Sequence, residues 1–208
     1  MKRPFTIEAC VDSLEAAKAA EKNGADQIEL CSRLDVGGLT PDFTLIKQVK
    51  ESLNIPIRVM IRPREGDFYY SDDEVEDMID SISKCRYINV EGVVLGATTS
   101  SMKKLDMELL EELAAVAYPL PVTIHKAIDE CTSPVQEVTR LKKIKNIDAV
   151  LTSGKAETAL EGQNILVEMI NEAGARINII SAGKITSENL EDVHEAIGGK
   201  FYHGRKII

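Results

Sequence analysis

The side chains in this sequence that are able to do chemistry lie at the carboxyl ends of short apolar runs. Two runs end on an acid and a thiol each, Glu8 with Cys10 and Glu29 with Cys31. In a fold that alternates strands with helices, ligands bind beyond the carboxyl ends of the strands. The residues collected there therefore indicate a site rather than a role in stability alone. The later runs end on Arg62, His125, Thr152, Ser181 and His203.

Four of these side chains form a candidate acid–base site. Glu8 and Glu29 are carboxylates, and partial burial at a strand end raises a carboxyl pKa towards the range useful for proton transfer. Arg62 presents a planar fork that suits a carboxylate or a phosphate, and His125 is able to bind metal or transfer protons near neutral pH. The alternatives are a structural salt bridge for Arg62 and a structural role for His125. As an enzyme, the chain would be a metal-assisted lyase or hydrolase acting on a small anionic or sugar-like substrate, with Glu8, Glu29, Arg62 and His125 as its catalytic residues.

A second group of side chains is typical of an anion site. Residues 152–155 (TSGK) and 181–184 (SAGK) follow the sixth and seventh runs, where barrel enzymes often hold phosphate with backbone N–H groups. The same short sequences also occur in ordinary turns between a strand and a helix. Arg64 lies two positions after Arg62, so an extended backbone would point both side chains the same way. The candidate substrate-binding or anion-binding residues are Arg64, Ser153, Gly154, Ser181, Gly183 and His203.

The apolar runs alternate with amphipathic segments along the whole chain. Asp12 is a candidate N-cap for the first helix and Gly24 ends it, while Pro134 suits the first turn of a later helix. The predicted strands are residues 5–10, 26–31, 57–61, 92–95, 121–125, 148–152, 176–180 and 201–203. The predicted helices are residues 13–23, a segment ending near 53, 72–86, 106–117, a segment starting at 134, 156–173 and 186–197.

Eight strands alternating with helices predict a single domain over residues 1–208, folded as a (β/α)8 TIM barrel. The alternative is an open, doubly wound sheet, but no Gly-x-Gly-x-x-Gly pattern follows the first strand. The sequence given stops soon after the last strand, so the barrel is expected to lack a full eighth helix. We expect this to leave apolar surface near the last and first strands, which favours a homodimer.

The composition is that of an ordinary globular domain, with 44% hydrophobic and 28% charged residues. The net charge of −9 argues against nucleic acid as a partner, and no apolar run is long enough for a membrane span or a signal peptide. The four cysteines form no Cys-x-x-Cys pair. We therefore expect a cytoplasmic protein with free thiols.

Several short motifs resemble those of the CutC copper-homeostasis family in wording, order and spacing. They include residues 8–13 (EACVDS), 24–32 (GADQIELCS), 37–41 (GGLTP), 60–64 (MIRPR) and 66–68 (GDF). Residues 121–127 (PVTIHKA), 151–154 (LTSG) and 202–204 (YHG) extend the resemblance over nearly the whole chain. The resemblance implies a compact TIM barrel and a role in copper binding and tolerance. It implies no particular catalytic reaction.

A role in copper handling directs attention to Cys10 and Cys31, because Cu(I) is soft and prefers sulfur. They end neighbouring strands, so their sulfurs can approach each other at one mouth of the barrel and bind Cu(I) linearly. The alternative is that small buried cysteines only fill the barrel interior. Cys85 and Cys131 are expected to be structural. Side-chain alternation predicts an acid pair, Glu8 with Glu29, one layer away from the thiol pair.

Overall fold

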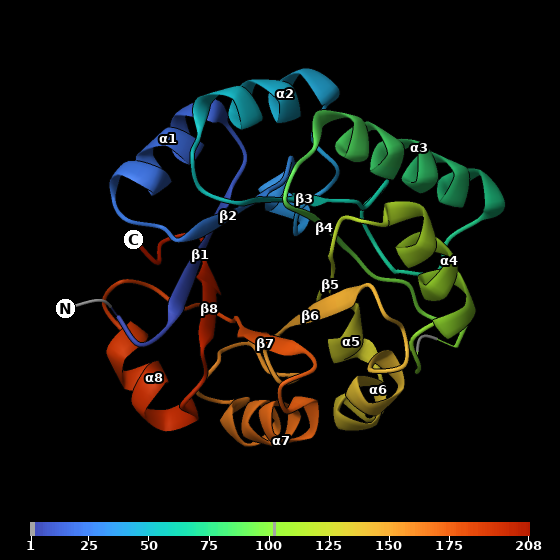
Figure 1. The fold of residues 1–208 in the computed structure, drawn as a ribbon. Helices are drawn as coiled ribbons and strands as arrows, with labels where there is room; N and C mark the ends of the chain where they lie inside the picture. The colour runs from blue at the N-terminus through green and yellow to red at the C-terminus, as the bar shows by residue number, and fades with distance from the viewer. Residues whose placement is uncertain (1–2, 102) are drawn as a thin grey trace.

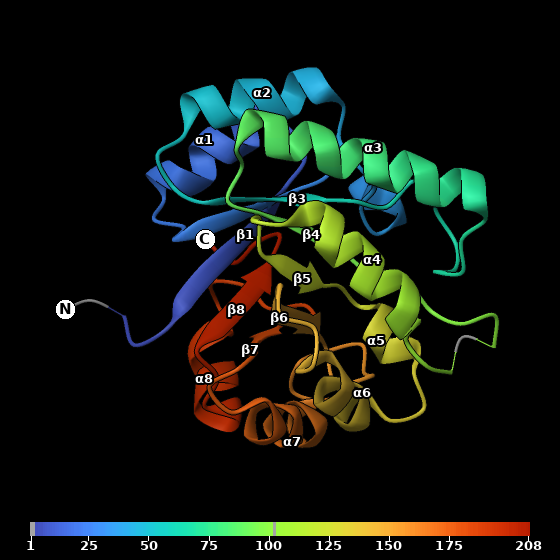
Figure 2. The ribbon, with the colours of Figure 1, turned by 45° about the vertical axis from the view of Figure 1, so that its right-hand side comes forward.

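Eight parallel strands form a closed barrel in which each strand pairs with its neighbours in sequence order, and β1 also pairs with β8. The structure is a computed structural model and describes residues 3–101 and 103–208. Figures 1 and 2 show the strands as a central ring with the helices around its outside. The strands are β1 (Thr6–Val11), β2 (Gln27–Leu30), β3 (Ile57–Met60), β4 (Gly92–Leu95), β5 (Val122–Ile124), β6 (Ile147–Thr152), β7 (Asn178–Ser181) and β8 (Phe201–Gly204).

In the part of the chain that the structure describes, seven long helices and one single-turn helix connect these strands. The single-turn helix, α5 (Ala127–Glu130), was not predicted from the sequence. The predicted TIM barrel is confirmed, and residues 205–208 after β8 contain no helix. The other helices are α1 (Leu14–Lys22), α2 (Phe43–Ser52), α3 (Asp72–Ile88), α4 (Met107–Ala117), α6 (Pro134–Leu141), α7 (Gln163–Ala173) and α8 (Leu190–Ile197), and η1 (Leu34–Val36) is a short 3₁₀ turn.

Local sequence explains most helix starts, with two corrections. The N-cap of α1 is Ser13 and not Asp12, because the Ser13 hydroxyl oxygen accepts from the Ala16 N–H at 3.2 Å. The helix predicted from residue 156 begins only at Gln163. Before it, the Glu161 carboxylate accepts from the Thr158 N–H, which closes a separate turn. A Cβ on Gly162 would lie 2.0 Å from the Ser153 carbonyl oxygen, so this turn packs tightly on the loop after β6.

The outer faces of β1 and β8 are covered, contrary to the expectation from the sequence. Tyr202, on the outer face of β8, is fully buried against His194 of α8 and against Phe5. Ile207 in the final segment is 2% exposed, and the C-terminus lies beside β1 (Figures 1 and 2). The argument from exposed apolar surface therefore no longer supports a homodimer. None of the helices in residues 3–101 and 103–208 combines the length and apolar character of a membrane span.

A polar cluster near the amino ends of the strands joins distant parts of the barrel. The Arg58 guanidinium donates to both carboxylate oxygens of Asp148, at 2.9 and 2.7 Å, and to the Thr123 hydroxyl at 2.6 Å. These residues belong to β3, β6 and β5. A bidentate pair of this kind is among the stronger polar contacts in proteins.

Replacing Arg58 by methionine is expected to lower the free energy of unfolding by about 2 kcal/mol. The substitution leaves the Asp148 carboxylate, 35% exposed, without its bidentate donor. Urea denaturation measures the change. Lys47→Met is the matched control, because Lys47 pairs with Glu51 only on the exposed face of α2 and should change the value by less than about 0.5 kcal/mol. Equal effects of the two substitutions would contradict this role of Arg58.

Candidate functional site

The pairing of β1 with β2 positions a carboxyl group between two thiols. In the register of these strands Cys10 lies opposite Glu29, and Glu8 lies opposite Gln27. Side chains alternate along a strand, so Glu8 and Cys10 share the inner face of β1. For the same reason Glu29 of β2 and Cys31, the residue after β2, point to the same side. The three residues Cys10, Glu29 and Cys31 therefore meet inside the barrel.

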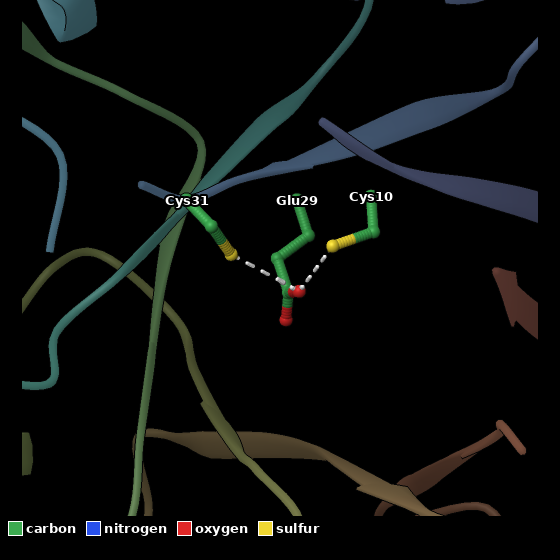
Figure 3. Close-up of side chains that lie close together, drawn as sticks. All are labelled: Cys10, Glu29 and Cys31. Carbon is green, nitrogen blue, oxygen red and sulfur yellow. Dashed lines mark hydrogen bonds between the residues drawn. The ribbon is translucent and has the colours of Figure 1, made fainter. Parts of the chain in front are cut away.

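The two sulfurs converge on one oxygen atom. Glu29 Oε2 lies 3.3 Å from Cys10 Sγ and 3.4 Å from Cys31 Sγ, and Figure 3 shows both contacts. One ligand atom from each of the three residues lies within 4.8 Å of the others. Cys31 and Glu29 are almost completely buried, while Cys10 is 7% exposed and lines the cavity described below. We call Cys10, Glu29 and Cys31 the sulfur cluster.

A glycine pair after β2 closes the chain over the sulfur cluster. Gly38 has φ of +92°, in the left-handed region that favours glycine, and a Cβ at this position would lie 3.1 Å from Cys31 Sγ. The adjacent Gly37 has φ of +91° and lies against the Arg62 guanidinium. The loop is therefore able to pack directly on the Cys31 sulfur, which explains why Cys31 has no exposed surface.

Glu8 lies beside the sulfur cluster and has partners of its own. One carboxylate oxygen lies 2.8 Å from His203 Nδ1, and the other accepts from the Gln27 side-chain amide at 2.7 Å. His203 Nε2 is 3.8 Å from Glu29 Oε2, so His203 connects Glu8 to the sulfur cluster. Glu8, Glu29 and His203 form a second group whose ligand atoms lie within 4.8 Å of one another.

The two thiols differ in acidity. A hydrogen bond donated by the Cys31 S–H lowers the pKa of Cys10 well below its usual range, although burial opposes this, and His203 lowers it further. The same hydrogen bond, together with burial, raises the pKa of Cys31 well above its usual range. Cys10 is therefore the thiol of the pair that loses its proton at the lower pH, and Cys31 is the one that keeps its proton to the higher pH.

The acid and the imidazole next to Cys10 are also shifted. Burial raises the pKa of Glu29 well above its usual range, and the charge of Cys10 raises it further. Burial alone would lower the pKa of His203, but Glu29, Cys10 and Glu8 together raise it well above the usual histidine value. The raised pKa of His203 and the lowered pKa of Cys10 together favour a cation next to an anion, which balances buried charge.

The structure corrects the predicted separation into an acid layer and a thiol layer. Neighbouring strands of a closed barrel are staggered, so residues of equal position in two strands lie at different heights. Cys10 therefore lies level with Glu29 and not with Cys31. Glu8 lies one step below, level with His203 of β8. The acids and thiols form one interleaved group.

The sulfur cluster faces a cavity of about 520 Å³ at the carboxyl ends of the strands. Glu29, Arg62, His125 and His203, predicted from different strands, all line this cavity. Its wall also includes apolar residues, among them Leu34, Met60, Phe68, Leu151 and Ile185. The size falls within the range of small-molecule sites.

Arg62 and Arg64 point to different places, contrary to the prediction. Arg62 is 6% exposed and lines the cavity. Arg64 lies outside it, where its guanidinium donates to Asp67 and Glu74 at 2.9 and 2.5 Å. The reason is that β3 ends at Met60, so no extended strand aligns the two arginines.

Only some of the candidate anion-binding residues line the cavity. The loop at Ser153 and Gly154 does bind a carboxylate, but it is that of Asp129, which accepts from the Ser153 and Lys155 backbone N–H groups at 3.0 and 3.1 Å. Ser181 is buried beside Gly199 and does not line the cavity. Gly183 and His203 do line it.

Two side chains beside the site were not among the predicted site residues. Gln27 donates to Glu8, and its position two residues before Glu29 on the same strand face was an available signal. Asp129 occupies the loop after β6, and no local pattern connects residues so distant along the chain.

The whole chain is similar to one family of proteins. Residues 5–208 match the model described as the CutC family. The protein is 43% identical over 199 residues to the human "Copper homeostasis protein cutC homolog", which covers 96% of this chain and 72% of the relative. A solved CutC structure from Streptococcus agalactiae is 29% identical, covers 98% of this chain and all of that chain, and superposes with a TM-score of 0.92.

More distant solved structures share only the fold. Dihydrodipicolinate synthase DapA-2 from Bacillus anthracis is 18% identical, with a TM-score of 0.67 over 98% of this chain and 70% of that chain. At this level of identity the similarity shows the barrel fold alone.

The ultraviolet absorbance of thiolates is expected to show one cysteine titrating well below the usual value of about 8.5. Cys10→Ser should remove this step. Cys31→Ala should move it to higher pH, because Cys10 loses the S–H that stabilises its thiolate while its burial remains. Cys85→Ala is the control, since the pKa of buried Cys85 is raised to about 12. A low step that survives Cys10→Ser would refute the assignment.

Proposed function

The chain belongs to the CutC family, and from this we propose that it binds Cu(I) through Cys10 and Cys31 and acts in copper homeostasis. The observation that supports this best is the pair of buried sulfurs converging within 4.8 Å inside the barrel. Cu(I) prefers soft thiolate ligands and needs few of them. Two metal–sulfur bonds of about 2.3 Å each, the length of a zinc–sulfur bond, span about 4.6 Å in a linear site, and the two sulfurs lie within 4.8 Å of each other.

The charges around the sulfur cluster suit a monovalent cation. The lowered pKa of Cys10 eases the loss of its proton on Cu(I) binding, and the raised pKa of Cys31 makes its proton the harder one to displace. Two thiolates with one Cu(I) ion have a net charge of −1, which the neighbouring imidazolium of His203 compensates. Glu29 orients both sulfurs through one oxygen atom.

The donor set favours Cu(I) over a structural Zn²⁺ ion. Structural zinc sites have four ligands in a tetrahedron, and the groups found in the described part of the chain offer three each. Cys10 lines the cavity, so the ion has an entry path from the barrel mouth. Reduced thiols also require a reducing compartment, which is why we place this function in the cytoplasm. The lyase or hydrolase considered from the sequence stays a prediction.

Titration of the reduced protein with Cu(I) against a competing chelator is expected to give tight binding of one ion. The Cys10→Ser, Cys31→Ser double variant should lose this binding. Glu29→Gln should weaken it by about tenfold, because the carboxyl group orients both ligands.

The matched control is the Cys85→Ala, Cys131→Ala double variant. It removes the same number of buried thiols, but from α3 and from the residue after α5. Its Cu(I) affinity should equal that of the unchanged protein. Retained affinity in the Cys10→Ser, Cys31→Ser variant, or loss in the control, would contradict the proposal.

A further inference from the structure

The cavity contains a second arrangement of polar groups that the sulfur cluster does not use. We propose that Arg62 and His125 bind a small organic oxyanion, a carboxylate or a phosphate attached to an apolar body, in this cavity. Both side chains line the cavity and are at least nine-tenths buried, and each has a nitrogen atom without a hydrogen-bond partner in the described chain.

Arg62 has a buried positive charge, and its hydrogen-bond partners among the described residues are all neutral. One terminal nitrogen donates to the carbonyl oxygens of Val36 and Gly38 at 3.1 and 3.2 Å, and the other donates to Gly66 at 2.9 Å. Its Nε is buried and without a partner among the described residues. A buried charge without a counter-charge is unfavourable, so an anion that accepts from Nε would stabilise it.

His125 supplies a neutral donor with a defined tautomer. Its Nδ1 accepts from the Ala127 N–H at 3.1 Å, so the proton of the neutral ring is on Nε2. Burial, together with the charge of Arg62, lowers the pKa of His125 to about 3, which keeps the ring neutral. Nε2 is buried and lacks an acceptor in the part of the chain that the structure describes. A bound oxygen atom would supply that acceptor.

Phe68 holds these two groups on one side of the cavity. The Arg62 guanidinium lies 4.9 Å from the centre of the Phe68 ring, and the His125 ring centre lies 4.7 Å from it. The Phe68 ring is apolar, and the two hydrogen-bond donors lie against it. This combination suits a ligand with an apolar body and an anionic head.

The cavity mouth is basic in a protein whose net charge is −9. Lys126, Arg205 and Lys206 are exposed and line the mouth, whereas Lys184 is paired with Glu157 there. A local concentration of cations attracts anions and raises their association rate. The apolar wall and the volume of about 520 Å³ suit a small organic molecule.

Calorimetric titration of the copper-free, full chain with benzoate, phenyl phosphate and benzyl alcohol tests the proposal. The three probes share an aromatic body, and only the first two have an oxyanion. We expect at least one of the two anions to bind, with benzyl alcohol at least about tenfold weaker. The comparison of benzoate with phenyl phosphate identifies which head group the site prefers.

Variants with matched controls test the residues. His125→Phe and Arg62→Lys should each weaken anion binding by about fivefold to tenfold, because each removes a donor at the unpartnered nitrogen. His194→Phe and Arg140→Lys make the same changes away from the cavity and should bind like the unchanged protein. The Cys10→Ser, Cys31→Ser variant should also retain anion binding, which separates this test from that of Cu(I) binding.

Three outcomes would overturn the proposal. They are no binding of either anion at millimolar concentration, equal binding of benzyl alcohol, and unchanged affinity in folded His125→Phe and Arg62→Lys. If both variants fail to fold, the NMR signal of the His125 Nε2–H proton in the unchanged protein decides. It should shift on addition of phenyl phosphate, and a signal that does not move would refute the site.

Discussion

The stagger between β1 and β2 is the constraint on which the site depends. It sets Cys10 opposite Glu29 and places Cys31 one step further along, so one carboxyl oxygen contacts both sulfurs. A shift of this register by one residue would turn the inward side chains of β2 to the outer face. The pairing is maintained by barrel closure, since β1 also pairs with β8 and aligns Glu8 with His203.

Barrel closure also explains why these ionisable groups tolerate burial. The Glu8 carboxylate is hydrogen-bonded to His203 and Gln27. The Cys31 thiol stabilises the ionised form of Cys10, which lowers the pKa of Cys10. Burying a polar group without partners is unfavourable, and the described part of the chain leaves only a few such atoms at the cavity. They include Glu29 Oε1, Arg62 Nε and His125 Nε2. Polar groups left unsatisfied in this way mark where ligands replace the missing contacts.

The sequence predicts the barrel well and the site only in part. All eight strands lie where the apolar runs predict them, because that pattern is local. The proximity of Cys10 to Cys31 is also predictable, because these residues end neighbouring strands. The sequence does not predict that Glu29 lies opposite Cys10, because this alignment depends on the stagger of the closed sheet. The same holds for Asp129, which fills the loop predicted to bind an anion, and for Arg64, which leaves the cavity after β3 ends.

The central claim is that a staggered pair of strands forms a two-sulfur site for Cu(I). X-ray absorption spectroscopy at the copper edge of the Cu(I)-loaded protein tests it most directly, because it reports the number and type of atoms bound to the ion. We expect a first shell of two sulfur atoms and a near-edge spectrum typical of two-coordinate Cu(I). A shell made mainly of nitrogen or oxygen atoms would contradict this account.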